Sequence, residues 1–332
     1  MKHFALTGIA GYIAPRHLQA IKDTGNLLVA SLDPHDSVGI LDRYFPNANY
    51  FSEFERFDRH LDRLKRSPDR QAIDYLTVCV PNYLHDAHIR LALRLGASAI
   101  CEKPLVANPW QLDALQELES EVEGSVYGIL QLRVHPALQK LRRELHQDLA
   151  QNKKRKQVTL TYITGRGPWY LYSWKGDHDK SGGIGTNIGI HFFDLLLWFF
   201  GKVQQSEVYL SEPTVMSGML ELEHADVTWF LSIDRQDLPP EVSEKGQTTY
   251  RSITIDGEEV EFSHGFTDLH TRVYEATLEG NGFGLETNRP SIELVHQLRR
   301  APVEKKNIRL GHPFLMRRLG LLGRSSWGGV TD

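Results

Sequence analysis

The stretch Phe4-Ala-Leu-Thr-Gly-Ile-Ala-Gly-Tyr-Ile-Ala-Pro-Arg-His17 joins a short apolar run to a glycine turn near the start of the chain. Gly8 and Gly11 stand where backbone amides would approach an anion closely, and a helix beginning just after them would favour a phosphate at its N-terminus. The Gly-x-x-Gly spacing has one residue more than the usual Gly-x-Gly loop. The stretch therefore predicts either a pyrophosphate-binding loop or a plain turn between a strand and a helix.

A carboxylate at the end of the next apolar run favours the pyrophosphate loop. Asp33 follows the run 27–32, about 20 residues beyond the loop, where an acidic side chain would accept the ribose hydroxyls of a dinucleotide. A carboxylate there would repel a 2′-phosphate, so we expect NAD rather than NADP. The alternative is a cap or turn residue before Pro34.

Composition narrows the class of protein. The chain has 332 residues, 41% hydrophobic and 24% charged, which is typical of a soluble globular protein of one large or two ordinary domains. A net charge of −4 argues against a general nucleic-acid binder. The two cysteines, Cys79 and Cys101, lie in apolar runs and are expected to be buried thiols; with no signal peptide, they indicate a cytoplasmic protein. The longest apolar run, 192–200, is short for a membrane span and contains Asp194.

The order of apolar and amphipathic segments predicts an α/β fold. Apolar runs at 4–7, 27–32, 73–80, 97–101 and 126–132 alternate with helical patterns at 17–22, 84–95 and 109–121. This alternation indicates a Rossmann-type doubly wound parallel sheet in residues 1–133. Residues 134–302 carry longer alternating strands at 158–163, 207–210, 217–222, 226–233 and 252–255. They predict an α+β substrate and oligomerisation domain with a large open antiparallel sheet. Residues 303–332 are expected to form a tail over the surface.

Polar side chains follow two apolar strands of the first domain. The stretches are Val80-Pro-Asn-Tyr-Leu-His85 and Cys101-Glu-Lys-Pro104. Parallel strands end at the ligand-binding edge of a sheet, so we expect Lys103 to point into a cleft there. A surface ion pair between Glu102 and Lys103 is the alternative.

A third motif lies in the second domain, where a glycine-rich loop at 181–185 leads into an apolar helix. Asn187 and His191 are four residues apart and would share one face of that helix. Asp194, three residues further on, is placed to hold the His191 ring from behind. A hydrogen-bonded core histidine is the alternative to a catalytic one.

Together these motifs resemble those of the glucose–fructose oxidoreductase, inositol dehydrogenase and MocA family. The likeness rests on the glycine loop, the Val80-Pro-Asn strand end with His85, Glu102-Lys-Pro104, and the Gly189-x-His191-x-x-Asp194 helix, in that order. It implies a Rossmann domain, a second domain with an open sheet, NAD as cofactor, no metal, and a homodimer or homotetramer. Two positions depart from the usual family pattern. The glycine loop is one residue longer, and Asn187 replaces the aspartate of many members. An amide cannot serve as a general base.

A narrower group within the family is similar in GIAGYIAPRH, TYITGRGPWYLYSWKGD and TNIGIHFFD. Its members oxidise the 3-hydroxyl of a UDP-linked N-acetylglucuronate in bacterial surface-polysaccharide biosynthesis. Retained NADH is reoxidised by 2-oxoglutarate, and an aminotransferase acts on the product. The resemblance implies that Lys103 polarises the 3-oxygen, that His191 accepts its proton, with Lys103 as the alternative acceptor, and that Asn187 positions the sugar. These three residues are the predicted catalytic set.

Two further sets of contacts are expected. Cofactor contacts are predicted at strand ends and loop amides: Gly8, Gly11, Tyr12, Ile13, Asp33, Val80, Pro81, Asn82, His85, Glu102, Lys103, Gln131 and Tyr170. Substrate contacts are predicted at cations, aromatic residues and the catalytic helix: Arg16, Lys103, Arg133, Arg166, Tyr172, Trp174, Lys175, Thr186, Asn187 and His191. Arginine suits the diphosphate and carboxylate of such a substrate, and aromatic rings suit its base or sugar. For the aromatic stretch, a sheet edge or a subunit contact is the alternative.

Two other functions remain open at this stage. One is a related dehydrogenase of a polyol or simpler sugar, which would need fewer anion-binding residues. The other is a non-catalytic regulator that senses a cofactor, although the presence of both Lys103 and His191 disfavours it. The sequence has 15 histidines, but none forms a His-Glu-x-x-His spacing, so no metal is expected.

Overall fold

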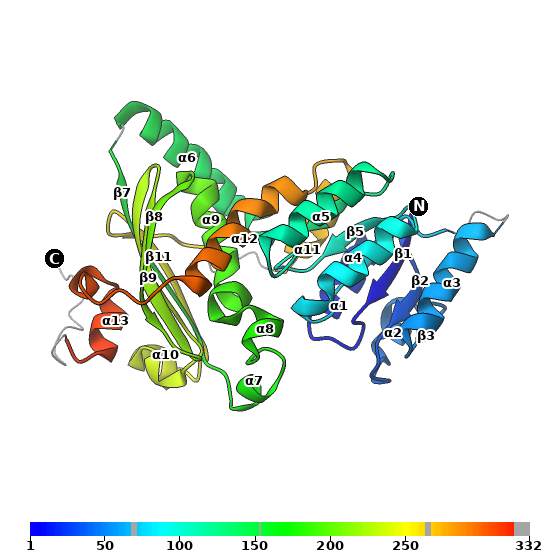
Figure 1. Cartoon of the computed structure of the whole chain (residues 1–332), viewed down its shortest axis with the longest axis horizontal. Helices are drawn as coiled ribbons and strands as arrows, with labels where there is room; N and C mark the ends of the chain where they lie inside the picture. The colour runs from blue at the N-terminus through cyan, green and yellow to red at the C-terminus, as the bar shows by residue number, and fades with distance from the viewer. Residues whose placement is uncertain (68–71, 153, 263–266, 322–332) are drawn as a thin grey trace. The chain divides into compact units, whose positions relative to one another are not determined.

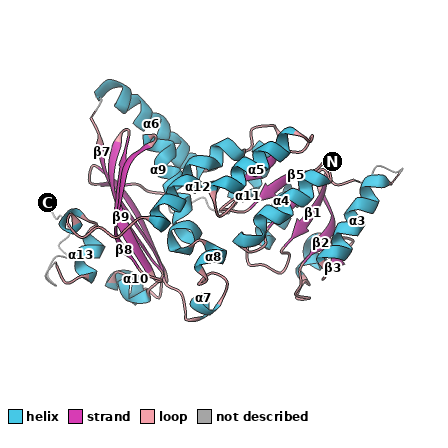
Figure 2. Cartoon of the chain, in the orientation of Figure 1, coloured by secondary structure: helices cyan, strands magenta, loops and turns pink. Residues whose placement is uncertain are grey.

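The computed structural model describes residues 1–67, 72–152, 154–262 and 267–321. The chain divides into two compact units, each discontinuous in sequence. The first comprises Met1–Gln139 and Ser263–Glu293, and the second Lys140–Phe262 and Leu294–Asp332. Figure 1 traces both units by residue number, and Figure 2 marks their helices and strands.

The first unit is built on a parallel sheet with strand order β3-β2-β1-β4-β5-β6. Its strands are β1 (His3–Thr7), β2 (Leu27–Leu32), β3 (Asn49–Phe51), β4 (Tyr75–Val78), β5 (Ser98–Cys101) and β6 (Val126–Gly128). The order reverses between β1 and β4, which is where doubly wound sheets bind ligands outside the carboxyl ends of their strands. The predicted Rossmann sheet is therefore confirmed.

Helices cover this sheet and bury its apolar residues. They are α1 (Ala14–Asp23), α2 (Ile40–Tyr44), α3 (Phe54–Arg66), α4 (His85–Arg94), α5 (Pro109–Ser120) and α11 (Leu269–Leu278). Helix α1 buries Ala14, His17, Leu18 and Ile21 at helical spacing. This stripe belongs to the same core cluster as Phe4 and Leu6 of β1 and Tyr274 of α11. A polar residue, His17, thus occupies a fully buried position among apolar ones.

The second unit contains a sheet of order β12-β11-β7-β10-β9-β8. Its strands are β7 (Lys156–Thr164), β8 (Val203–Ser211), β9 (Val215–Leu222), β10 (Ala225–Ser232), β11 (Thr249–Ile255) and β12 (Glu258–Glu259). The prediction of a purely antiparallel sheet was wrong at one place, because β10 pairs with β7 in parallel. Three α-helices, a π-helical turn and two strands separate β7 from β10 along the chain, a connection long enough for a parallel crossover.

Neighbouring residues of β10 point to opposite faces of this sheet. The Trp229 ring meets Phe193 of α9 (Ile190–Phe200), with ring centroids 5.3 Å apart. The Phe230 ring stacks on His312, with centroids 5.6 Å apart. Phe230 also shares a core cluster with residues of α10 (Pro240–Glu244) and α13 (Pro313–Arg318). Residues of β10 therefore pack against helices on both faces of the sheet; α9, α10 and α13 are labelled in Figure 1.

The apolar segment that ends in α9 is the core helix of the second unit. It spans His178 to Phe200 and comprises α8 (His178–Ser181), which ends at Gly182 in the left-handed conformation, a π-helical turn η3 (Gly185–Gly189), and α9. At 23 residues it is long and apolar enough to cross a bilayer, but 78% of its most apolar window is buried inside the protein. The sequence argued against a membrane span because the apolar run 192–200 is short. In the structure the helical segment is longer, and its burial identifies it as part of the core.

The remaining helices are α6 (Pro136–Asn152), α7 (Trp169–Tyr172) and α12 (Leu285–Arg300). The described part of the predicted tail is largely exposed from residue 302 to residue 310, and it is anchored to the sheet at two places. The Glu304 amide donates to the Val208 carbonyl over 2.7 Å, and Leu315 is fully buried. Leu315 belongs to an apolar cluster on one face of the sheet, and this contact anchors the exposed segment before it. Residues 322–332 lie outside the described part.

His312 should make the second unit sensitive to acid. Burial lowers the pKa of this ring to about 3, and it accepts the Phe314 amide while its Nε2 pairs with Thr161. Below pH 6.5 the unfolded chain takes up a proton that the folded chain excludes. Stability is therefore lost as pH falls from 6.5 towards 3, by up to about 4 to 5 kcal/mol.

Urea unfolding at pH 6.8 and pH 4.5 measures this loss. We expect His312→Gln to remove about 2 kcal/mol of the pH-dependent loss seen in the wild type. His146→Gln, at an exposed position of α6, should leave that loss unchanged. Equal pH dependence of wild type and His312→Gln would contradict the assignment.

Candidate functional site

The glycine loop lies between β1 and α1 and fits closely against the end of β4. Gly8 has a φ of +85°, and a Cβ at this position would lie 2.6 Å from the Cys79 carbonyl. The Gly11 amide donates to the Gly8 carbonyl over 3.0 Å, which turns the chain into α1. Only glycine allows both the left-handed backbone and this close approach at position 8. The loop is therefore a shaped turn at the carboxyl edge of the sheet, where a dinucleotide phosphate would lie.

Asp33 connects the glycine loop to the end of β2. Its Oδ2 accepts the Ala10 amide and its Oδ1 accepts the His35 amide, each over 2.9 Å. The side chain therefore stabilises the turn at Pro34, which was the alternative to a cofactor role. Because a carboxylate has about four lone-pair sites, two remain for ribose hydroxyls. The predicted cofactor role of Asp33 is compatible with this arrangement and stays a prediction.

His85 holds two loops of the first unit together. Its Nδ1 lies 2.7 Å from the Pro104 carbonyl oxygen, and its Nε2 lies 2.9 Å from that of Val80. Burial lowers the pKa of His85, and a neutral ring donates to one of these oxygens at a time. Asn82, next to Pro81, is also buried. The His85 ring is thus engaged by the protein, so a cofactor contact in this segment would come from its backbone or from Asn82.

Glu102 has its carboxylate occupied by protein donors. Oε1 lies 3.0 Å from the Nε2 atoms of both His17 and His270, and Oε2 accepts the Lys103 amide over 3.2 Å. Burial alone would raise the pKa of Glu102, but the hydrogen bonds from the two histidines outweigh it and hold that pKa well below its ordinary value. The surface ion pair considered from the sequence is excluded for Glu102, which is buried. Its predicted cofactor contact, if made, would use its backbone.

Lys103 follows this buried carboxylate and is itself half-buried. The peptide bond between Lys103 and Pro104 is cis. Pro104 and Leu105 are buried on its C-terminal side. With buried neighbours before and after it, the lysine starts from a backbone held at the carboxyl edge of the parallel sheet.

Gln131 and Arg133 were expected at the end of a strand. They lie instead in a 3₁₀ turn η2 (Gln131–Val134) that follows the short strand β6. Within the part of the chain that the structure describes, the buried Gln131 Oε1 has no hydrogen-bond partner. An unpartnered buried oxygen is costly unless a ligand N–H reaches it. With the glycine turn and Asp33, this orphan acceptor makes the first unit fit an NAD molecule. Tyr12 and Arg16, two other predicted contacts, are exposed, and Ile13 is half-buried.

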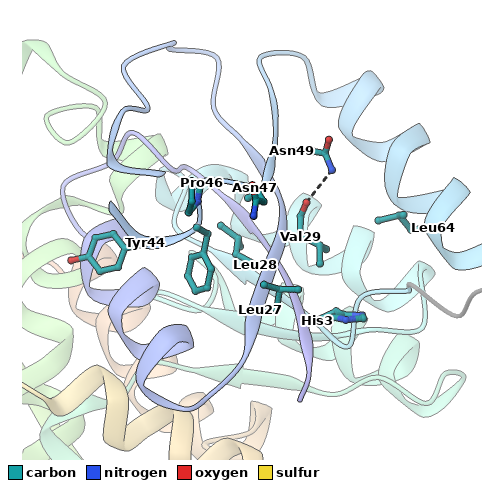
Figure 3. Close-up of a pocket in the computed structure, with 11 residues that line it drawn as sticks. His3, Leu27, Leu28, Val29, Tyr44, Pro46, Asn47, Asn49 and Leu64 are labelled. Atoms are coloured by element: carbon teal, nitrogen blue, oxygen red, sulfur yellow. Dashed lines mark hydrogen bonds between the residues drawn. The ribbon is translucent and has the colours of Figure 1, made fainter. Parts of the chain in front are cut away.

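A separate cavity lies at the opposite edge of this sheet (Figure 3). It measures about 490 Å³, and its lining includes His3, Leu27 and Asn49, the first residues of β1, β2 and β3. Asn49 Nδ2 donates to the Val29 carbonyl over 3.3 Å. None of the predicted site residues lines this cavity. Its place at the amino ends of the strands separates it from the glycine loop.

In the second unit, the predicted aromatic and cationic residues form a local cluster after β7. Lys175 Nζ lies 4.3 Å from the Trp174 ring centroid and 5.8 Å from that of Trp169. Burial, followed by the nearby charge of Arg166, lowers the pKa of Lys175. Tyr172 is 90% exposed. Two neighbouring cations beside indole rings suit an anionic ligand that carries a flat or sugar ring.

The glycine-rich segment of the second unit brings two predicted residues together. Asn187 Nδ2 donates to the Tyr170 hydroxyl over 2.5 Å, and burial raises the pKa of that tyrosine. The buried Thr186 Oγ1 has no partner among the described residues. Asn187 and His191 were expected on one face of a regular α-helix. Asn187 lies instead in the π-helical turn η3, and His191 lies in α9. A π-helical turn is frequent at functional sites.

His17, His270 and Tyr274 form a hydrogen-bonded cluster with Glu102 and were not among the residues predicted from the sequence. The signal for His17 was weak but present, because a histidine occupied the apolar stripe of the predicted helix at 17–22. His270 and Tyr274 come from a helix far along the chain, and no pattern connects them with His17. With Glu102, the two histidines form the one group of potential metal ligands found among the described residues. No ligation is inferred, because each Nε2 already donates to the carboxylate.

Comparison with known proteins identifies relatives of both units. The family described as "Oxidoreductase family, NAD-binding Rossmann fold" matches residues 2–127, and its C-terminal alpha/beta domain matches residues 154–224. The WlbA (WbpB) dehydrogenase of Thermus thermophilus, solved with NAD and UDP-GlcNAcA, is 53% identical with a TM-score of 0.89. The match covers 95% of this chain and 100% of that chain. A second structure of that dehydrogenase, 54% identical at the same coverage and TM-score, holds NAD and alpha-ketoglutarate.

More distant relatives share the fold or part of the chain. The WlbA dehydrogenase of Bordetella pertussis is 20% identical with a TM-score of 0.72, covering 90% of this chain and 94% of that one. An uncharacterized oxidoreductase of Synechocystis is 27% identical over 152 residues, which is 46% of this chain and 40% of the relative. The chain thus spans less than half the length of this curated relative.

The Gly8 turn generates a direct test of the dinucleotide loop. Gly8→Ala forces a Cβ against the Cys79 carbonyl at a positive φ, so we expect about tenfold or weaker NAD binding and a loss of roughly 2 to 4 kcal/mol in unfolding free energy. NADH fluorescence titration and urea unfolding measure the two effects.

Gly25→Ala is the matched control. Gly25 has a φ of +71°, and nothing lies within 4 Å of the place that a Cβ would take there, so this variant carries the backbone cost without the steric one. It should lose about 1 kcal/mol of stability and keep its NAD affinity. Unchanged NAD affinity in Gly8→Ala would show that the loop does not bind the cofactor.

Proposed function

The chain belongs to the oxidoreductase family with an NAD-binding Rossmann fold, and from this we propose that it oxidises the 3-hydroxyl of UDP-N-acetylglucosaminuronic acid to a ketone. The observation that carries the proposal is the 53% identity, along 95% of the chain, to a dehydrogenase solved with NAD and UDP-GlcNAcA. The second structure of that dehydrogenase supports 2-oxoglutarate as the co-substrate. NAD, held by the glycine loop and Asp33, would supply the hydride chemistry for oxidation of the sugar and reduction of 2-oxoglutarate.

The chain's own residues would move one proton and hold the sugar. We assign proton acceptance from the 3-hydroxyl to the His191 ring, whose intrinsic pKa suits a base at neutral pH. The Lys103 ammonium would polarise the same oxygen and stabilise the negative charge that develops on it. Asn187 would donate a hydrogen bond to the sugar, because an amide orients a hydroxyl without taking its proton. Its bond to the buried Tyr170 hydroxyl supports a fixed orientation.

The charged parts of the substrate would bind to cations. Arg166 and Lys175 lie near each other beside Trp169 and Trp174, which supports recognition of the carboxylate or the diphosphate. Arg16 and Arg133 are the predicted cations of the first unit. A free polyol would have no use for this number of cations, and this favours the sugar-nucleotide substrate over the alternative.

The wider context follows from the chemistry of the product. A 3-keto sugar nucleotide is a substrate for an aminotransferase, so we place the reaction in bacterial surface-polysaccharide (O-antigen) sugar biosynthesis. The buried thiols of Cys79 and Cys101 support a reducing cytoplasm. We further propose a homo-oligomer, a dimer or a tetramer.

A coupled assay tests the reaction. The protein is mixed with the UDP-sugar uronate, NAD and 2-oxoglutarate, and mass spectrometry follows the 3-keto sugar and 2-hydroxyglutarate. We expect both products in equal amounts. Absence of the ketone, together with turnover of a free polyol such as an inositol, would refute the sugar-nucleotide assignment.

Lys103→Ala and His191→Asn test the catalytic roles. General acid–base catalysis contributes about 100- to 10,000-fold, so each variant should lose at least about 100-fold in kcat. Lys140→Ala and His146→Asn, at exposed positions of α6, serve as controls and should keep wild-type turnover. Normal turnover of either site variant removes that residue from the mechanism.

A further inference from the structure

A buried carboxylate stands at the centre of a hydrogen-bonded chain in the first unit. Glu102 Oε1 is shared by the Nε2 atoms of His17 and His270, each 3.0 Å away. The side chain of Glu102 is 10% exposed, and those of His17 and His270 are 0% and 4% exposed. These residues come from the loop after β5, from α1 and from α11, so the carboxylate joins segments far apart in the sequence.

Each hydrogen bond in this series donates in the direction of the Glu102 carboxylate. Burial lowers the pKa of His17, so its ring is neutral and carries one N–H. With that N–H at Nε2, facing Glu102, the His17 Nδ1 accepts the Tyr274 hydroxyl over 2.9 Å. Thr77 Oγ1, 2.8 Å from the Tyr274 oxygen, then donates to it. A consistent direction of donation along such a chain strengthens each bond in a buried environment.

The second oxygen of Glu102 is directed at the catalytic segment. Oε2 accepts the amide of Lys103 over 3.2 Å, and on the other side of Lys103 the His85 ring contacts the Pro104 carbonyl over 2.7 Å. The peptide that carries Lys103 is therefore held from both sides by buried side chains.

We propose that Glu102, held by His17 and His270, is a positioning residue for Lys103. It fixes the lysine peptide relative to α1, the helix that begins at the glycine loop, and it places a buried negative charge in the same loop. This inference rests on the proposed function, in which Lys103 polarises the substrate oxygen.

Glu102→Gln tests the proposal, because it keeps the size of the side chain and removes its charge. The amide has one acceptor oxygen and an NH₂ group, so it cannot accept from both histidines and from the Lys103 amide at once. We expect kcat to fall at least tenfold while the Kd for NAD changes less than threefold. We also expect the pH–rate profile to shift by half a unit or more.

Hydrogen exchange gives a readout that needs no turnover. In NAD-free protein, the Lys103 amide of Glu102→Gln should exchange about tenfold faster than in the wild type. This readout separates failure of the positioning role from failure of the proposed substrate: lack of ketone formation by the wild type refutes the substrate, whereas unchanged amide exchange refutes the positioning.

Glu119→Gln is the matched control, since Glu119 Oε1 also accepts a backbone amide, that of Val126, over 2.7 Å. It should keep the kcat and pH profile of the wild type. If Glu102→Gln does not fold, His270→Gln replaces it with the same expected changes.

Besides unchanged amide exchange, three further results would overturn the proposal. The first is a kcat and pH profile of Glu102→Gln equal to those of the wild type. The second is a loss of kcat matched by an equal loss of NAD affinity with an unmoved pH profile, which indicates a structural role alone. The third is a stoichiometric transition metal found by mass spectrometry in purified protein and lost in Glu102→Gln, which makes the three residues a metal site.

Discussion

The hydrogen bonds from two imidazole rings to the buried carboxylate of Glu102 are the interaction on which the structure of the first unit depends. A buried charge is tolerated only when donors compensate it, and here His17, His270 and the Lys103 amide do so. These donors come from the helix after the glycine loop, from the helix α11 and from the loop after β5 that carries Lys103. One unsatisfied group in this cluster would leave a charge without compensation, so the geometry of the loop and the packing of α1 and α11 are coupled.

Much of the fold was predictable, because it rests on local patterns. The apolar runs that became β1 and β2, and the helical spacing of α1, carry their own signal of period and length. The strand β3 (Asn49–Phe51) showed no pattern in the sequence, because it has only three residues and lies at the edge of the sheet. The parallel pairing of β7 with β10 was also hidden, because strand alternation reveals which residues share a face and not which strand lies alongside.

The sequence motifs of the candidate site could be recognised, but the residues that contact those motifs in the structure could not. Gly8 and Lys103 were predicted because each lies in a recognisable motif, the glycine loop and Glu102-Lys103-Pro104, although each motif also had a structural explanation. The sequence did not reveal that the carboxylate of Glu102 serves the protein, since its partner His270 is separated from it by 168 residues. It also did not reveal the π-helical turn at Asn187, which depends on how Gly185–Gly189 packs in the core of the second unit.

Transfer of an isotopic label tests the central claim, oxidation at carbon 3 with 2-oxoglutarate as the final acceptor. The UDP-sugar uronate carrying deuterium at carbon 3 is incubated with the protein, NAD and 2-oxoglutarate. The account predicts one deuterium at carbon 2 of each 2-hydroxyglutarate formed, and a ketone without deuterium at carbon 3. Deuterium that stays on the sugar, or 2-hydroxyglutarate formed without label, would contradict it.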